Sequence, residues 1–154
     1  MPSTFSQIYI QVVFAVRKRE CLINPEWEEE LYRYINRIIQ KKGQKPLAIN
    51  GMPDHIHILI GLTPDCRLSD LVREIKKSSN NFINAHKIPS GGFKWQEGYG
   101  AFSYNQSHLD AVIQYIFNQK KHHLNKTFKK EYTDLLIRFQ IPHKSEFLFD
   151  WLEE

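Results

Sequence analysis

The fold is decided by the stretch Pro46-Leu-Ala-Ile-Asn-Gly-Met-Pro-Asp-His-Ile-His-Ile-Leu-Ile60. Its middle, Gly51-Met-Pro53, contains the two residue types that most often turn a chain, and a run of alternating side chains follows. Such alternation is typical of a β-strand, because successive side chains point to opposite faces of a sheet. The stretch therefore predicts a β-hairpin in which His55 and His57 share one face and the neighbouring isoleucines share the other.

The segments around this hairpin carry strand and helix patterns in turn. β-Branched and aromatic residues dominate the stretch before it, and apolar residues recur at helical spacing on both sides. The expected elements are a strand at 7–16, a helix at 24–42, strands at 46–50 and 55–60, a helix at 68–85, a strand at 93–104, and helices at 107–123 and 127–139. The first six spell βαββαβ, which predicts one α+β, ferredoxin-like domain over 1–154. Its four-stranded antiparallel sheet would have helices on one face, followed by C-terminal helices.

Two of these helices begin with capping signals. Asn24-Pro25 offers an N-cap side chain followed by a first-turn proline, and Lys42-Gly43 ends the helix that follows. Ser107-His-Leu-Asp110 has the spacing of a capping box, which predicts the start of the helix that runs to 123.

The composition is that of an ordinary globular protein with a mildly basic balance. Hydrophobic residues make up 42% and charged residues 25% of the 154 residues, which excludes a disordered chain. The 21 Lys and Arg against 17 Asp and Glu leave a formal net charge of +4. Basic residues gather within 73–77 and 120–130, and acidic ones within 26–30 and 150–154. We therefore expect one positive face, which permits a polyanionic partner.

Targeting and cysteine patterns favour a cytoplasmic protein. Residues 1–6 lack the basic and then apolar pattern of a signal peptide. The longest apolar stretch, 56–62, is too short to span a membrane, so no membrane partner is expected. The two cysteines, Cys21 and Cys66, lack a CxxC spacing and are too few for a disulfide framework, which favours a reducing compartment.

The histidine pair is a candidate metal site. Two imidazoles on one strand face, separated by one residue, can bind a metal together, and neutral imidazole accommodates several transition metals. The alternative is two surface histidines on the solvent face of a hairpin. The spacing of His55 and His57 does not by itself decide between the two.

A second candidate site lies on the helix expected at 107–123. Its apolar stripe leaves Tyr115 and Gln119 one turn apart on one flank, away from the core face. A phenol and an amide in these positions can reach into one site, and His108 and His122 share the flank. The alternative is a tyrosine at the boundary of an amphipathic helix, beside an ordinary polar neighbour.

Both candidate sites occur in one chain and in this order, together with further matching segments. The combination resembles the HUH (histidine–hydrophobe–histidine) single-tyrosine transposases of the smallest insertion sequences, including their relatives associated with repetitive extragenic palindromes. The resemblance covers most of the chain. The matching segments are 12–14, 52–59, 71–79, 95–103 and 115–123.

The resemblance implies roles for four residues. His55, His57 and Gln119 would be metal ligands and Tyr115 the nucleophile, which would cleave and rejoin single-stranded DNA through a 5′-phosphotyrosine intermediate. An amide, a phosphate and water as ligands suit Mg²⁺ or Mn²⁺, and two imidazoles favour Mn²⁺. The resemblance also implies recognition of DNA hairpins and a homodimer, in which the tyrosine helix of one subunit completes the other's site in some relatives.

Residues outside these four are candidates for DNA contacts. Basic side chains contact phosphates and aromatic rings stack on unpaired bases. The phosphate candidates are Arg73, Lys76, Lys77, Lys120 and Lys121, the stacking candidates are Trp95, Tyr99, Phe102 and Tyr104, and the backbone candidates are Ser78, Ser79 and Asn80. The alternatives are a solvated helix face for the basic residues and core positions for the aromatic ones.

Three other functions stay open at this point. Replication initiators and relaxases share the two histidines and a tyrosine, but they tend to be larger. A domesticated regulator would bind palindromic DNA without cutting it. A ferredoxin-like module that binds a metal or a small molecule would show no salt-dependent affinity for DNA.

Overall fold

Four strands pair into one antiparallel sheet in the computed structural model, which describes residues 3–18, 21–145 and 148–151. The strands are β1 (Tyr9–Ala15), β2 (Lys45–Met52), β3 (His55–Gly61) and β4 (Gly100–Tyr104). They lie in the order β2-β3-β1-β4, which is the order of a ferredoxin-like βαββαβ unit. The predicted α+β fold is therefore confirmed, including the hairpin of β2 and β3.

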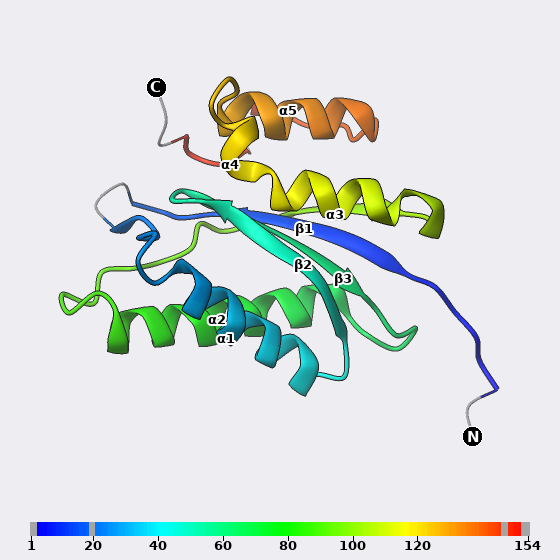
Figure 1. Cartoon of the computed structure of the whole chain (residues 1–154), viewed down its shortest axis with the longest axis horizontal. Coiled ribbons are helices and arrows are strands. Elements are labelled where there is room, and N and C mark those ends of the chain that lie inside the picture. Colours follow the sequence, from blue (N-terminus) through cyan, green and yellow to red (C-terminus); the bar gives the residue numbers. More distant parts are fainter. Residues whose placement is uncertain (1–2, 19–20, 146–147, 152–154) are drawn as a thin grey trace.

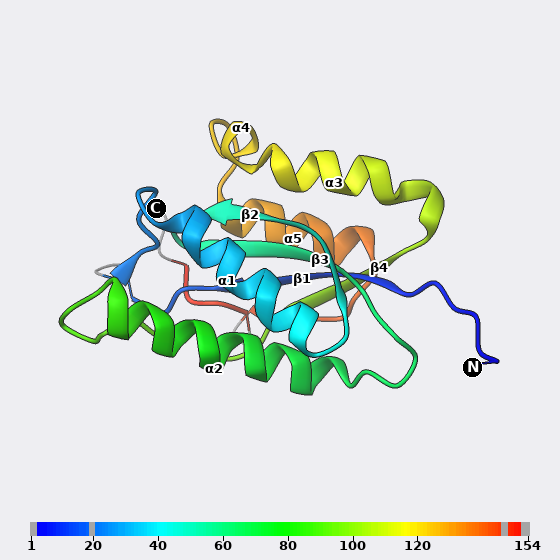
Figure 2. The ribbon, with the colours of Figure 1, turned by 60° about the horizontal axis from the view of Figure 1, so that its bottom comes forward.

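The helices form a layer on each face of the sheet (Figures 1 and 2). They are α1 (Glu28–Lys41), α2 (Leu68–His86), α3 (Leu109–Phe117), α4 (Gln119–His122) and α5 (Phe128–Arg138). The first two pack together on one face as predicted, and α3, α4 and α5 cover the other face (Figure 1). Within the described ranges, no helix combines the length and the apolar character that a membrane crossing requires.

The alternation along β3 directs its side chains into two different layers. Its isoleucines belong to the large core cluster that also contains the buried apolar residues of α1 and α2. Leu59 packs instead with Val112 and Ile116 of α3. Because side chains alternate along a strand, His55 and His57 share the face of Leu59 and lie beneath the C-terminal helices. The predicted division of β3 into a histidine face and an isoleucine face is therefore confirmed.

The third helix expected from the sequence is divided in two. A 3₁₀ turn at Gln106–His108 precedes α3, and Asn118 interrupts the helix between α3 and α4. The predicted capping box does not form, because Ser107 Oγ donates to Asn105 Oδ1 at 2.6 Å instead. Asparagine is a poor helix former, since its side chain competes with the helical backbone for hydrogen bonds. The interruption separates the helix of the tyrosine from that of Gln119.

Two other boundaries differ from the prediction. Asn24 Oδ1 accepts from the backbone N–H of Glu26 at 2.8 Å, so it closes a turn that precedes α1 instead of capping the helix. The strand expected at 93–104 pairs continuously only from Gly100 onward. Before that point, Trp95 makes an isolated bridge to Val16.

Candidate active site

The two histidines of β3 turn their Nε2 atoms toward the C-terminal helices. His55 Nδ1 lies 2.7 Å from Asp54 Oδ1, and His57 Nδ1 lies 2.7 Å from Gln11 Oε1. These oxygens can only accept, so each Nδ1 carries a proton and each Nε2 is left to face the site. Metal-binding histidines are commonly held in this way by a partner on the outer nitrogen. Both rings are fully buried, so neither is the surface histidine of the alternative interpretation.

A buried carboxylate of α5 stands opposite these nitrogens. Glu131 Oε1 lies 3.3 Å from His55 Nε2, 3.1 Å from His57 Nε2 and 3.0 Å from His123 Nε2. The Glu131 side chain is almost completely excluded from solvent. One ligand atom from each of His55, His57 and Glu131 lies within 4.8 Å of the others, which places them around a common point.

The atoms around this point suit a cation. With protons on Nδ1, the Nε2 atoms of His55 and His57 and the Oε1 atom of Glu131 all present lone pairs. Buried lone pairs that face one another are stable only with a cation between them or a proton on one ring. Two imidazoles and a carboxylate are ordinary ligands for a divalent metal, so the residues present fit such an ion.

Tyr115 and Gln119 reach the same carboxylate from α3 and α4. Glu131 Oε2 accepts hydrogen bonds from the Tyr115 hydroxyl and from Gln119 Nε2, the latter at 2.8 Å. The side-chain oxygen of Gln119, Oε1, lies 3.3 Å from His55 Nε2, so it also faces the metal position. The Tyr115 ring stands edge-on to His57, with 5.9 Å between the ring centroids. The structure thus brings together the four residues singled out from the sequence.

Burial and charge decide which of these groups is ionised. Burial opposes the charged form of His55, but the hydrogen bonds to Asp54 and Glu131 raise its pKa to about 9. Burial raises the pKa of Tyr115 above its ordinary value, and the carboxylate of Glu131 raises it further. Burial likewise opposes ionisation of Glu131, yet the surrounding histidines hold its pKa below the usual range. A proton on His55 therefore supplies positive charge to the site whenever a metal does not.

Glu131 received no role from the sequence, although a signal was present. It falls on the same helical stripe as Phe128, Tyr132 and Leu135, which are all buried. A carboxylate at a core position of an amphipathic helix requires a buried partner. That requirement marks Glu131 as unusual, but only the fold identifies its partners as the two histidines and the tyrosine.

Six of the residues expected to contact DNA lie around one pocket on the opposite side of the sheet, which we call the α2 pocket. It has a volume of about 650 Å³, and its lining includes Arg73, Lys76, Lys77 and Asn80 of α2 together with Trp95 and Tyr99. Arg73 and Lys77 are exposed. Lys76 Nζ donates to two carbonyl oxygens of the 96–98 loop, at 2.8 and 2.6 Å, and burial lowers its pKa to about 8. Three cations from one helix therefore border a single hollow.

Two of the aromatic candidates for base stacking are core residues, which corrects that expectation. Trp95 is 4% exposed, packs edge-on against Phe14 and donates through Nε1 to Ser79 Oγ at 3.0 Å. Phe102 is 1% exposed. Ser79 is also fully buried, so it is not available to contact a DNA backbone. Burial of such large rings contributes strongly to the stability of a core. Of the four aromatic candidates, only Tyr99 and Tyr104 are partly exposed.

The remaining basic candidates are separated from the α2 pocket. Lys120 and Lys121 belong to α4, which lies across the sheet from α2 (Figure 1). Lys120 Nζ pairs with Glu28 Oε2 at 3.1 Å and donates to the carbonyl oxygen of Gly51, while Lys121 is exposed. The expectation of one positive face is therefore wrong, because the chain path places the two basic segments on opposite faces of the sheet.

Comparison with known proteins points to transposases. A family model described as "Transposase IS200 like" matches residues 4–119. The ISDra2 transposase TnpA of Deinococcus radiodurans is 23% identical over 118 residues, which are 73% of this chain and 84% of that protein.

Two solved structures share the fold. A crystal structure of a candidate transposase from Deinococcus radiodurans superposes with a TM-score of 0.62 at 22% identity, over 77% of this chain and 95% of that one. A REP-associated tyrosine transposase bound to a REP hairpin superposes with a TM-score of 0.59 at 18% identity, over 80% and 73% of the two chains. Helix α5, which contributes Glu131, lies beyond the segment that the family model matches.

Proposed function

The chain belongs to the IS200-like transposase family, and on this premise we propose that it cleaves and rejoins single-stranded DNA through a covalent bond to Tyr115. The observation that carries the proposal is the meeting of Tyr115, His57 and Glu131 in one buried site. A phenol held at the edge of a candidate metal site is suited to attack a phosphate. Membership of a transposase family supports DNA as the substrate.

The proposed step exchanges one phosphate ester for another. Attack by the Tyr115 oxygen on the scissile phosphorus forms a bond to the phenol and breaks the bond to O3′, which leaves a 5′-phosphotyrosine. The Tyr115 hydroxyl donates its hydrogen bond to Glu131 Oε2, but the histidines hold the pKa of that carboxyl low, so the phenol proton passes on to solvent and a solvent proton completes the departing 3′-hydroxyl. Attack by a 3′-hydroxyl then reverses the step: the proton of the 3′-hydroxyl passes to solvent, and Tyr115 regains a proton. The phosphotyrosine conserves the bond energy, so no nucleoside triphosphate is required.

The residues around the site would hold a divalent metal, Mg²⁺ or Mn²⁺. His55, His57 and Glu131 would supply two imidazole nitrogens and a carboxylate oxygen, and the amide oxygen of Gln119 would supply a fourth ligand. The oxygen ligands suit either ion and the imidazoles favour Mn²⁺. Such an ion would polarise the scissile phosphate as a Lewis acid.

The α2 pocket is the proposed surface for the DNA backbone. Arg73 and Lys77 are exposed beside Lys76, and cations that border one hollow attract phosphates. The similar transposase bound to a REP hairpin supports a hairpin as the partner. Lys121 is a separate candidate contact on the active-site side of the sheet.

The site is proposed to work within one chain. Tyr115, both histidines, Gln119 and Glu131 meet within one chain, which supports this proposal. The homodimer implied by the resemblance stays a prediction, and exchange of tyrosine helices between subunits is the alternative arrangement.

The test is formation of a covalent adduct. The protein is incubated with Mn²⁺ and labelled single strands from the DNA that flanks its gene, and the products are separated on a denaturing gel with and without protease. We expect a retarded, protease-sensitive band that is lost in Tyr115→Phe. Tyr34→Phe, a matched change on α1 far from the site, should keep the band. A full yield of adduct from Tyr115→Phe would show that another group is the nucleophile.

A regulator that binds palindromic DNA without cutting it is the rival function. It predicts tight, salt-dependent binding of a flanking hairpin and no adduct with any strand. The same incubation, followed by a native gel, therefore distinguishes the two functions.

A further inference from the structure

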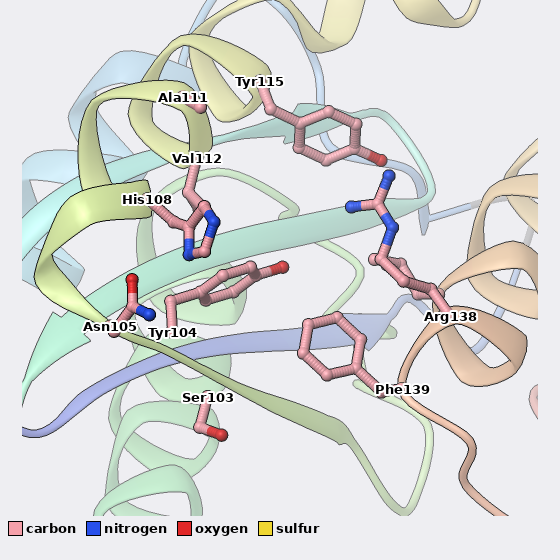
Figure 3. A pocket seen from close by; sticks show the side chains of 10 residues that line it. Ser103, Tyr104, Asn105, His108, Ala111, Val112, Tyr115, Arg138 and Phe139 are labelled. Atoms are coloured by element: carbon pink, nitrogen blue, oxygen red, sulfur yellow. The ribbon is translucent and has the colours of Figure 1, made fainter.

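A second cavity opens beside Tyr115, away from the metal position. It has a volume of about 670 Å³, lies between β4, α3 and α5, and includes Tyr104, Tyr115, Arg138 and Phe139 in its lining. Figure 3 shows these rings and the Arg138 guanidinium around a common space. The volume is within the range of about 300–1,000 Å³ that is usual for small-molecule sites. We call it the Tyr115 pocket.

The walls of the Tyr115 pocket are flat and held in place. The Tyr104 and Phe139 rings meet edge to face, with 5.4 Å between their centroids. The hydroxyl of Tyr104 accepts a hydrogen bond from Gln11 Nε2 at 2.8 Å, and the same Gln11 side chain orients His57. The pocket and the metal position are therefore joined through one amide. Aromatic walls of this kind suit a planar ring.

The Tyr115 pocket also contains a cation that is free to bind an anion. Arg138 is exposed, and it pairs with no carboxylate among the described residues. Burial raises the pKa of the nearby Tyr104 phenol, and the positive charge of Arg138 opposes that rise. A guanidinium presents a planar fork of donors that matches the oxygens of a phosphate.

Arg138 lies on the same side of helix α5 as Glu131. The two residues are seven positions apart, which is close to two turns and about 10 Å along the helix axis. Tyr115 contacts Glu131 and also lines the pocket that contains Arg138. The nucleophile is thus flanked by the metal position and by the guanidinium. This half of the pocket is contributed by residues 128–138, which lie beyond the segment that the family model matches.

We infer that the Tyr115 pocket holds the nucleotide next to the scissile phosphate, with its base against Tyr104 and Phe139 and its phosphate at Arg138; this rests on the function proposed above. Because the two rings are nearly perpendicular, with 85° between their planes, the base stacks on the face of one ring and meets the edge of the other. Such stacking and one phosphate contact tolerate any base, since every base has a flat face. Asn105 and His108 at the wall add hydrogen-bonding groups next to the base edge. Arg138 then positions the strand for attack by Tyr115.

The test is a scan of single phosphates. Labelled single strands from the flanks of the gene each carry one neutral methylphosphonate, at successive positions. Binding is measured with Tyr115→Phe, which forms no covalent link, and with the same protein carrying Arg138→Gln, Arg138→Lys or Lys129→Gln. Lys129 is an exposed cation of α5 that does not line the pocket, so it controls for the loss of charge.

We expect one position at which the methylphosphonate weakens binding about tenfold in the protein with Arg138, as the loss of a charged hydrogen bond implies. The methylphosphonate at that position should have no effect on binding by the Arg138→Gln protein, a partial effect on binding by Arg138→Lys and the full effect on binding by Lys129→Gln. That position should adjoin the site at which the wild-type protein forms its adduct. The absence of any position that depends on Arg138, or a position remote from the adduct, overturns the inference.

The phosphate scan tests the Tyr115 pocket, and the adduct assay tests cleavage, so either proposal can fail without the other. If the wild-type protein forms no adduct but the scan finds an Arg138-dependent phosphate, the pocket is a nucleotide site and the cleavage function fails. If an adduct forms and no phosphate depends on Arg138, cleavage stands and the pocket assignment fails.

Discussion

The hydroxyl of Tyr115 donates a hydrogen bond to Glu131 Oε2, although the two residues lie on different helices and sixteen positions apart. The same carboxylate turns Oε1 toward His55 and His57. One side chain therefore connects the nucleophile to the metal position. A change at Glu131 should disturb both, whereas a change at Tyr115 should disturb only the nucleophile.

Glu131→Gln is expected to lower the affinity for Mn²⁺ by about 10- to 100-fold, because it removes a negatively charged ligand. The fold should persist, since the glutamine amide can donate to an imidazole Nε2 that the carboxylate faced. Calorimetric titration with Mn²⁺ measures the affinity. Tyr115→Phe is the control and should bind Mn²⁺ as the wild type does. An unchanged affinity in Glu131→Gln would mean that the carboxylate is not a ligand.

Gly100→Ala is expected to displace α5 from the sheet. A Cβ at Gly100 would lie 2.6 Å from Tyr132 Oη and 2.8 Å from its Cε1, which is closer than packed atoms allow. The free energy of unfolding in urea should fall by about 1–3 kcal/mol, as overpacking implies. Tyr132→Phe should recover part of the loss by removing the hydroxyl. Gly61→Ala is the control, because its Cβ would meet only ordinary contacts of 3.6 Å or more; equal stability of both alanine variants would contradict the packing.

Lys76 is expected to make stability depend on pH. Burial lowers its folded-state pKa from 10.5 to about 8. Below pH 8 both states are protonated and the cost of burying the charge is fully present. Between about pH 8 and 10.5 the unfolded state binds more protons, so the free energy of unfolding rises with pH through this window. Urea unfolding at several pH values should show this rise for the wild type relative to Lys76→Met, and parallel curves would contradict the assignment.

Mixing two inactive variants tests assembly of the site within one chain. Tyr115→Phe lacks the nucleophile and His57→Ala lacks a metal ligand, so neither should form an adduct alone. If each chain builds its own site, the mixture should also stay inactive, whereas exchange of tyrosine helices would create one intact site in a mixed dimer. The measurement is the adduct yield of the mixture after unfolding and refolding together. Recovery of adduct would show assembly from two subunits.

Much of the site could be predicted because its parts lie in short segments. His55 and His57 share a face through strand alternation alone. The helical pattern places Tyr115 and Gln119 one turn apart on a single helix, but Asn118 interrupts that helix and the two side chains meet through the carboxylate of Glu131 instead. The sequence therefore predicts their proximity but not its geometric cause.

The surface could not be predicted in the same way. Trp95 and Phe102 are ordinary candidates for stacking until the fold buries them beneath α2 and α5. Lys120 is an ordinary candidate for a phosphate contact until α1 brings Glu28 within 3.1 Å of it. Exposure and pairing depend on contacts between distant segments, which residue types do not reveal.

The sequence by itself determined the βαββαβ order, the hairpin and the two faces of β3, because these follow from periodicities of two and 3.6 residues that neighbouring side chains display. Only the tertiary structure decided that Glu131 faces the histidines, that Arg138 stands on the other side of Tyr115, and that the basic segments lie on opposite faces of the sheet. The physical reason is that a helix can pack on a sheet in many registers, and one of them is selected by the buried contacts of the whole chain, among them Gly100 beneath Tyr132.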